Sequence, residues 1–228
     1  MRILSADTSS RKFSIALLER GVPIDQYEPI SFNRHSSDLL PAIDKLLSRN
    51  SYSIEDVDAF CIGLGPGSFT GLRVGITTMR ALALSLKKPI VGIPSIDAIA
   101  HNLSGYKGYA SVIIDARQEK VYARRYSFSA KRIEPKGRIA LLGIDELLKN
   151  IKGPTIFLGD GLEIYKDRII EEKKELAAFA QESTYYPKAA IIGRLAIERL
   201  KTGKRDNAFK LSPLYIYPKE CQIKKHKR

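Results

Sequence analysis

The stretch CIGLGPGSFTGLRVGI, residues 61–76, decides most of what the sequence predicts about the fold. It contains five glycines and one proline, between an apolar run over 57–65 and a predicted helix over 68–86. A glycine inside a helix costs about 1 kcal/mol relative to alanine. We therefore expect these glycines to admit something that a side chain would exclude.

The spacing of the glycines limits what they can admit. Gly67, Gly71 and Gly75 recur every four residues, which leaves one face of a helix without side chains. No Gly-Lys-Ser/Thr follows, so the stretch is not a Walker phosphate loop, and it is not a well-placed dinucleotide fingerprint either. Two interpretations stay open: close packing of the helix inside the protein, and close approach of another chain.

The composition is that of a folded globular protein. The chain has 228 residues, of which 44% are hydrophobic and 28% charged, enough for one large domain or two small ones. Two cysteines, Cys61 and Cys221, make no disulfide framework and favour a reducing compartment. No signal peptide and no apolar run of ~20 residues is visible. We expect a cytoplasmic protein without a membrane segment, in which Cys61 is a small buried side chain.

The net charge of +13 raises the question of a polyanionic partner. Part of this charge lies in the terminal run KKHKR, residues 224–228. The charge has two interpretations: a solvated surface with a polar end, and a surface that faces RNA.

The first half alternates strands and helices. A helix is expected from Ser37 to Ser48, with its apolar residues on one face, Ser37 as its cap and Pro41 near the end of the first turn. Strands are expected over residues 2–7, 13–19, 25–31, 57–65 and 90–95.

The second half repeats this plan. Asp7 precedes Phe13 by six residues and Asp115 precedes Val121 by six, each in a strand–turn–strand unit. The strand and Gly-x-Gly of Ile156–Gly161 match those of 60–65, and a helix over 144–150 matches the one before them. We predict a duplicated α/β protein of two domains, residues 1–103 and 104–228, with mixed sheets flanked by helices.

Asp7, Thr8 and Asp115 are the candidates for nucleotide binding. A strand–Asp–turn–strand unit can hold phosphates with its turn amides while the carboxylate orients a metal or water. Both turns, DTSSRK and DARQEK, lack glycine, which favours the alternative that the two aspartates end strands and cap turns. The three histidines lie far apart in the sequence, and neither a metal cluster nor a catalytic triad is predicted.

The segment GLGPGSFTGLRVGI resembles the TsaB (YeaZ) family, non-catalytic members of the actin-like ATPase (ribonuclease H-like) superfamily. The resemblance extends over most of the chain: ILSADTSS at 3–10, RHSSDLLPAI at 34–43, IDARQEKVYARRY at 114–126, LGDG at 158–161 and SPLYIY at 212–217. It implies two actin-like domains and a role in making threonylcarbamoyladenosine beside the anticodon of tRNA.

The resemblance also implies that another subunit catalyses the formation of threonylcarbamoyladenosine. The family's catalytic relative, TsaD, carries a His-x-x-x-His metal pair that would fall here at Ser95 and Ile99, neither of which can replace an imidazole. It therefore implies no catalytic residue, no metal and no cofactor in the chain alone, with ATP at a partner interface in the complex. Three rivals remain: an ATPase or kinase of the same superfamily, a basic RNA-binding module, and a glycoprotease, for which the sequence shows neither a nucleophile–base pair nor a set of metal ligands.

The partners implied are a TsaD-like catalytic paralogue, a TsaE-like ATPase, tRNA through the complex, and a second copy of the chain when it is alone. The docking surface is expected on the glycine helix together with the helix from Ser37. The residues predicted for this surface are Gly67, Phe69, Thr70, Gly71, Arg73, Val74, Gly75, Thr78, Leu39 and Ile43.

Overall fold

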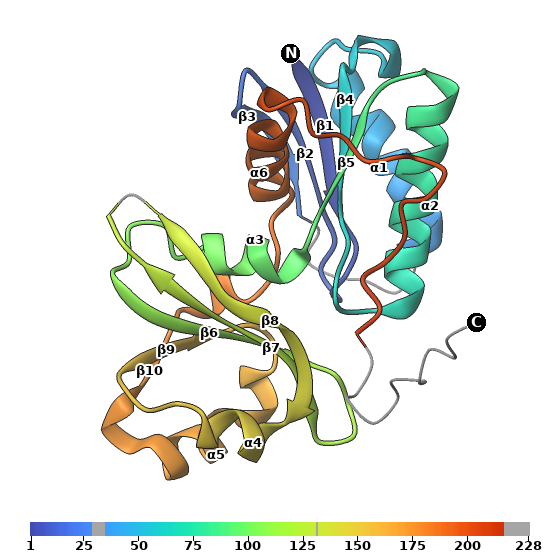
Figure 1. The fold of residues 1–228 in the computed structure, drawn as a ribbon. Helices are drawn as coiled ribbons and strands as arrows, with labels where there is room; N and C mark the ends of the chain where they lie inside the picture. Colours follow the sequence, from blue (N-terminus) through green and yellow to red (C-terminus); the bar gives the residue numbers. More distant parts are fainter. Residues whose placement is uncertain (29–34, 131, 217–228) are drawn as a thin grey trace, which may run out of the picture. The chain divides into compact units, whose positions relative to one another are not determined.

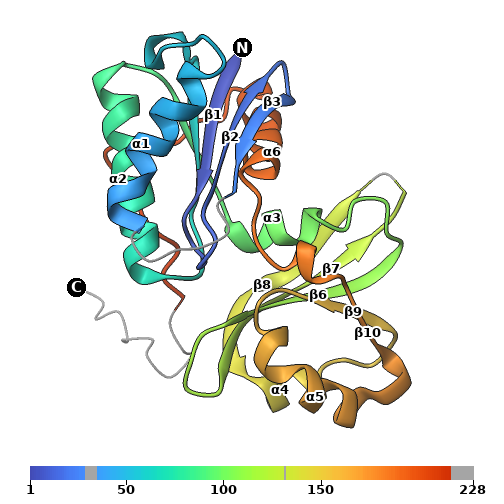
Figure 2. The same ribbon diagram turned by 180° about the vertical axis from the view of Figure 1, so that it is seen from behind.

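The computed structural model describes residues 1–28, 35–130 and 132–216, which form two compact units. Unit 1 consists of Met1–Asn102 and Tyr186–Leu214. Unit 2 consists of Leu103–Tyr185 and, of the described residues, also Tyr215 and Ile216. Figure 1 and Figure 2 show both units from opposite sides.

Unit 1 is built on a five-stranded mixed sheet of order β3-β2-β1-β4-β5. The first three strands pair antiparallel, and β4 and β5 continue the sheet in parallel from β1. The strands are β1 (Arg2–Asp7), β2 (Ser14–Glu19), β3 (Val22–Tyr27), β4 (Ala59–Gly63) and β5 (Ile90–Ile93).

Helices cover both faces of this sheet. Figure 1 shows α1 and α2 on one face and α6 on the other. Alternate residues of β1 enter two separate cores, Leu4 on the α1–α2 side and Ile3 on the α6 side, as the two-residue repeat of a strand requires. Cys61 is buried in the second core, as predicted. The helices are α1 (His35–Ser48), α2 (Phe69–Ser85), α3 (Ser95–His101) and α6 (Ala189–Lys201), with a 3-10 turn, η1 (Ile54–Asp56).

Unit 2 is built on a second five-stranded mixed sheet, of order β10-β9-β6-β7-β8. Its strands are β6 (Gly108–Asp115), β7 (Lys120–Phe128), β8 (Ile133–Gly143), β9 (Thr155–Leu158) and β10 (Ala177–Phe179). Its helices are α4 (Ile144–Lys149) and α5 (Leu162–Lys173), with 3-10 turns η2 (Lys174–Leu176) and η3 (Glu182–Thr184). Sequence analysis did not identify α3, α5, α6, β8 or β10.

The two sheets have the same order and the same strand directions. In each unit the first strand pairs antiparallel with the second and parallel with the fourth, so β6, β7 and β9 repeat β1, β2 and β4. The predicted class, mixed sheets flanked by helices, is confirmed, and so is the correspondence between the strand ends at 60–65 and 156–161.

The predicted domain division is wrong in its last part. Residues 186–214 belong to unit 1, not to the predicted domain 104–228. The physical reason is α6, whose small residues pack on the first sheet: Ser5 donates a hydrogen bond of 2.8 Å to the Ala189 carbonyl. A Cβ on Gly193 would meet Leu18 and Ser5, so the helix lies close against β1 and β2.

Two boundaries in the first half also differ from prediction. β3 begins at Val22 rather than Asp25 and includes Pro23. An edge strand tolerates proline because the missing N–H has no partner strand to bond on the outer side. The predicted end of this strand, residue 31, lies outside the described residues. Helix α1 begins at His35, so Ser37 lies inside the helix and Pro41 in its second turn. Among the described helices, none is long and apolar enough to cross a membrane.

Candidate functional site

The glycine face of α2 lies on the chain's own β1–β2 turn. A Cβ added to Gly71 would fall well under 3.0 Å from the Thr8 carbonyl oxygen, and one on Gly75 would fall as close to the Thr8 hydroxyl. A Cβ on Gly67 would meet the Ser9 carbonyl in the same way. The three glycines therefore give room to Thr8 and Ser9.

Hydrogen bonds join the two segments. The Thr8 hydroxyl donates to the Gly71 carbonyl over 2.8 Å, and the Ser68 amide donates to the Ser9 carbonyl over 2.6 Å. Ser68 is also the N-cap of α2, since its side chain accepts a hydrogen bond from the Gly71 amide. Gly67, Gly71 and Gly75 are thus sites of close packing inside unit 1, which corrects the prediction that they meet a partner.

Leu39 and Ile43 are also inside. Both are buried in the core between α1, α2 and the first sheet. The apolar periodicity that marked them belongs to the core-facing side of an amphipathic helix. Their prediction as partner contacts is therefore wrong.

Asp7 is fully buried at the end of β1. One carboxylate oxygen accepts hydrogen bonds from the Ser9 amide (2.8 Å) and the Ser9 hydroxyl (2.7 Å), and the other accepts one from the Ser95 hydroxyl (2.6 Å). Burial raises the pKa of Asp7, although these hydrogen bonds act in the opposite direction. The carboxylate is occupied by the turn that follows it and by the start of α3.

Asp115 has the same place in unit 2 but a different environment. It is half-buried at the end of β6 and accepts a hydrogen bond of 2.9 Å from the Arg117 amide. Arg117, Gln118 and Glu119 have φ values of 61°, 50° and 58°, in the left-handed region. Asp115 caps its turn, in agreement with the structural interpretation of this residue.

The remaining predicted contact residues lie on α2 outside the core. Phe69, Thr70 and Arg73 are exposed, and Val74 and Thr78 are half-buried. Phe69 is 55% exposed and the Arg73 guanidinium stacks over its ring at 3.8 Å. Helix α1 exposes Leu40 to the same extent, 55%, although the sequence placed it on the apolar face of this helix.

Curated relatives identify the family of this chain. The TsaB protein of Bacillus subtilis (strain 168), named a tRNA threonylcarbamoyladenosine biosynthesis protein, is 31% identical over 200 residues, covering 85% of this chain and 87% of the relative. The TsaB protein of Escherichia coli (strain K12) is 30% identical over 173 residues, with 73% and 74% covered. The chain belongs to the TsaB family.

A family model and a solved structure agree with this. The model described as TsaD, tRNA N6-adenosine threonylcarbamoyltransferase, matches residues 29–225. YeaZ from Pseudomonas aeruginosa superposes with a TM-score of 0.78 at 25% identity, covering 94% of this chain and 99% of that one. This superposition agrees with the predicted fold class of mixed sheets flanked by helices.

The structure of this TsaB-family chain shows what occupies the positions where TsaD was expected to carry histidines. Ser95 is fully buried; its hydroxyl donates to Asp7 and accepts a hydrogen bond of 3.0 Å from the Gly65 amide. Ile99 is buried. Over the described part of the chain, no group of three His, Cys, Asp or Glu side chains is placed to hold a metal ion. Sequence analysis did not predict the Asp7–Ser95 pair, because 88 residues separate its members.

Proposed function

We propose that this chain is a non-catalytic subunit in the formation of threonylcarbamoyladenosine in tRNA, and that it docks a TsaD-type enzyme on the outer side of α1 and α2. One observation carries the proposal: both helices expose a large apolar residue, Leu40 and Phe69, although their opposite sides fill the core. Exposed apolar residues on neighbouring helices are typical of a protein interface.

The dimensions of the two helices suit such an interface. α1 has 14 residues and α2 has 17, so at 1.5 Å per residue they are about 21 and 26 Å long. A stable interface buries ~800 Å² on each partner, which two helices of this length can supply. Phe69 and Arg73 would form the anchor, because stacked aromatic and arginine side chains are enriched among the residues that dominate binding energy.

The environment of Asp7 supports a non-catalytic role for this chain. In an actin-like ATPase this turn would hold phosphates, but here the Ser9 amide is bonded to Asp7, and α2 lies on Thr8 and Ser9. A nucleotide would have to displace packed backbone to reach the carboxylate. ATP in the complex therefore binds at a partner interface, outside this turn.

The same outer side would join two copies when the TsaD-type partner is absent. A homodimer and a heterodimer then compete for one surface, and a TsaE-type ATPase and tRNA enter through the assembled complex. Leu40 and Phe69 are expected to matter for both associations.

Reconstitution tests this function. The TsaD-type enzyme of the same organism, with its carbamoyl donor and tRNA, should form threonylcarbamoyladenosine many-fold faster with this chain than without it. The chain alone should form none and should not turn over ATP. Equal rates with and without the chain would refute the proposal, and ATP turnover by the chain alone that Asp7→Ala abolishes would favour the ATPase alternative.

A further inference from the structure

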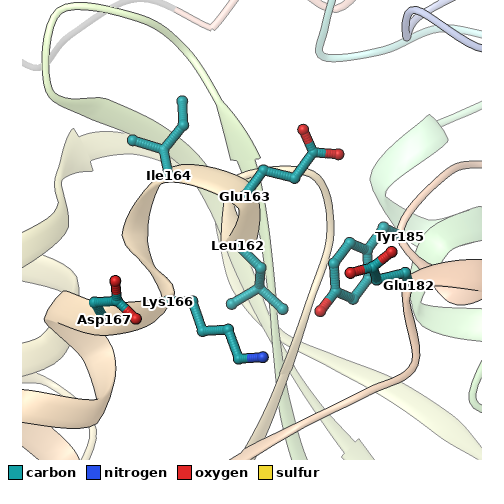
Figure 3. Close-up of a pocket in the computed structure, with 7 residues that line it drawn as sticks. All are labelled: Leu162, Glu163, Ile164, Lys166, Asp167, Glu182 and Tyr185. Carbon is teal, nitrogen blue, oxygen red and sulfur yellow. The ribbon is translucent and has the colours of Figure 1, made fainter.

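The charge of this chain is unevenly distributed over the described residues. The hollow beside α5 in unit 2 has three acidic side chains and one basic one in its lining, those of Glu163, Asp167, Glu182 and Lys166 (Figure 3). A polyanion is not attracted to such a surface. A surface of the opposite charge lies on unit 1, along the segment that follows α6, and the proposed docking on α1 and α2 does not use it.

This segment, residues 203–214, is here called the strap. Figure 1 shows it in red, running from the end of α6 across β5 to α2. The Asp206 amide donates to the Ile90 carbonyl over 2.9 Å, and the Leu214 amide donates to the Leu64 carbonyl over 2.9 Å. Between these points Leu211 is buried in the core beneath α1 and α2. The strap therefore has a fixed backbone, although it lies outside the helices and strands.

Phe209 projects from the strap into solvent. Its side chain is 75% exposed, the largest fraction among the large apolar residues of the described chain. Its carbonyl accepts a hydrogen bond of 3.1 Å from the Arg80 guanidinium of α2, and its amide donates to the Asn207 side chain over 2.9 Å. Ala208 before it and Leu211 after it pack on the core. The ring is thus held at the surface by a backbone that is fixed on both sides.

A single exposed apolar residue is ordinary, so the surroundings of Phe209 decide its meaning. Lys210 follows it directly, and the Arg80 guanidinium lies against its carbonyl. Lys204 and Arg205 stand five and four residues earlier, at most about 18 Å away along the chain. None of these four cations forms an ion pair with another described residue.

The acidic residue of the strap does not offset this charge. Asp206 is the one acidic residue among 203–214, and α2 has none. Each Asp206 carboxylate oxygen accepts a hydrogen bond of 3.0 Å from the Arg199 guanidinium of α6, and one of them also accepts one of 2.8 Å from the Gly92 amide. The carboxylate is therefore neutralised by Arg199, and the four cations around Phe209 keep their charge.

An exposed aromatic ring among cations fits a single strand of nucleic acid. Bases stack on aromatic side chains, and the phosphates between them contact lysine and arginine. A protein interface instead needs ~800 Å² on each partner with an apolar centre. The exposed neighbours of Phe209 in the strap, Asn207 and Lys210, are polar or charged, which favours the nucleic acid.

We propose that the strap binds single-stranded nucleic acid, with one base stacked on Phe209 and the adjacent phosphates held by Lys204, Arg205 and Lys210. Arg80 is a positioning residue, since it holds the Phe209 backbone. The inference does not rest on the proposed function, because it gives the chain a contact of its own with nucleic acid. An unpaired stretch of RNA and single-stranded DNA present the same chemistry.

The first test uses Phe209→Trp in the full-length chain. The sequence contains no tryptophan, so the fluorescence reports position 209 alone. Ten-nucleotide oligoadenylate RNA at low salt should quench it saturably, with a Kd of about 10–100 µM. Val22→Trp, at a 64% exposed position on β3, is the control and should show no saturable quenching. An abasic decamer, which keeps the phosphates, should bind at least fivefold more weakly. Unsaturable quenching at position 209, or equal affinity for the abasic decamer, would overturn the proposal.

The second test separates the ring from the charges, with fluorescence anisotropy of labelled oligoadenylate. Phe209→Leu should weaken binding roughly tenfold without changing its salt dependence or the melting temperature. Lys210→Gln should weaken binding and reduce the slope of log K against log salt concentration by about 0.7. Lys166→Gln, in the acidic surroundings of the hollow in unit 2, is the matched control and should change neither quantity.

Two results of the second test would contradict the proposal. Full affinity in Phe209→Leu would mean that the nucleic acid binds by charge alone, for example to the terminal run 224–228. Equal losses in Lys210→Gln and Lys166→Gln would mean that no particular surface is involved.

The source of the ligand is resolved with the Phe209→Trp chain. Tighter binding of the RNA decamer than of its DNA counterpart assigns the strap to RNA, and the reverse order assigns it to single-stranded DNA. Equal affinities show that only bases and phosphates are contacted, as proposed. Tighter binding of a ten-residue oligoglutamate than of either decamer would assign the strap to an acidic protein and overturn the proposal.

Discussion

The turns that follow the first strand of each unit have the same topology, but they differ in how deeply their aspartates are buried. Asp7 of the β1–β2 turn is fully buried, and Asp115 of the β6–β7 turn is half-buried. The helices that follow the two Gly-x-Gly segments differ: α2 contains Gly71 and Gly75, whereas α5 contains no glycine. A helix face without side chains allows α2 to lie on its turn and close it.

The difference between the two turns shows how one strand plan can carry a closed turn in unit 1 and an open turn in unit 2. Both Gly-x-Gly segments approach the first strand of their sheet, since a Cβ on Gly159 would meet the Ile113 carbonyl. Only unit 1 extends this close approach along the helix to Thr8 and Ser9. The closed turn occupies the glycine face of α2, and the other side of this helix exposes Phe69 and Arg73.

The largest effect should come from a side chain on the glycine face. Gly71→Leu should destabilise the chain by roughly 3 kcal/mol or more, because its Cβ would collide with the Thr8 backbone, which cannot rotate away. Thermal and urea unfolding measure this. Gly153→Ala in unit 2 is the control, since nothing lies within 4 Å of that position. Normal unfolding of Gly71→Leu would show that α2 does not lie on the turn.

The two aspartates should differ when each is truncated. Asp7→Ala leaves the Ser9 amide and the Ser95 hydroxyl without their acceptor and should cost about 2 kcal/mol. Asp115→Ala should stay within about 0.5 kcal/mol, since its turn is open to water. Equal losses in urea unfolding would contradict the distinction between a closed and an open turn.

A double-mutant cycle tests the contact between α2 and the β1–β2 turn. Gly75→Ala alone should be destabilising, because its Cβ would meet the Thr8 hydroxyl and methyl groups. Thr8→Ala removes both groups, so the double variant should recover about 1 kcal/mol relative to additivity. Strict additivity of the two changes would mean that these residues do not touch.

The smallest expected effect is a dependence of folding stability on pH. Because burial raises the pKa of Asp7 in the folded state, the folded chain binds more protons than the unfolded one between the two pKa values. Stability relative to Asp7→Asn should therefore fall as the pH rises through that interval. Unfolding curves of both proteins from acidic to neutral pH measure this dependence. If the free energy of unfolding of the unchanged chain rose relative to that of Asp7→Asn as the pH increased, the prediction would be wrong.

The sequence predicted the duplication because the strand and Gly-x-Gly patterns occur twice in the same order. It did not predict the return of α6 to unit 1, since the periodicity of a helix does not say which sheet it covers. The glycine spacing predicted close approach of backbone, but not that the backbone was that of Thr8. Leu39 and Ile43 were assigned to a partner because core-facing and partner-facing apolar residues have the same spacing. Leu40 also has this spacing, three residues before Ile43, and yet it is exposed.

The most direct measurement is the affinity of this chain for its TsaD-type partner, by calorimetry or sedimentation velocity. Leu40→Asp and Phe69→Asp should each weaken binding roughly tenfold or more without lowering the melting temperature, since both side chains are exposed. Val22→Asp, at a comparably exposed apolar position on β3, should bind as the unchanged chain does. Full affinity in both helix variants would contradict docking on α1 and α2.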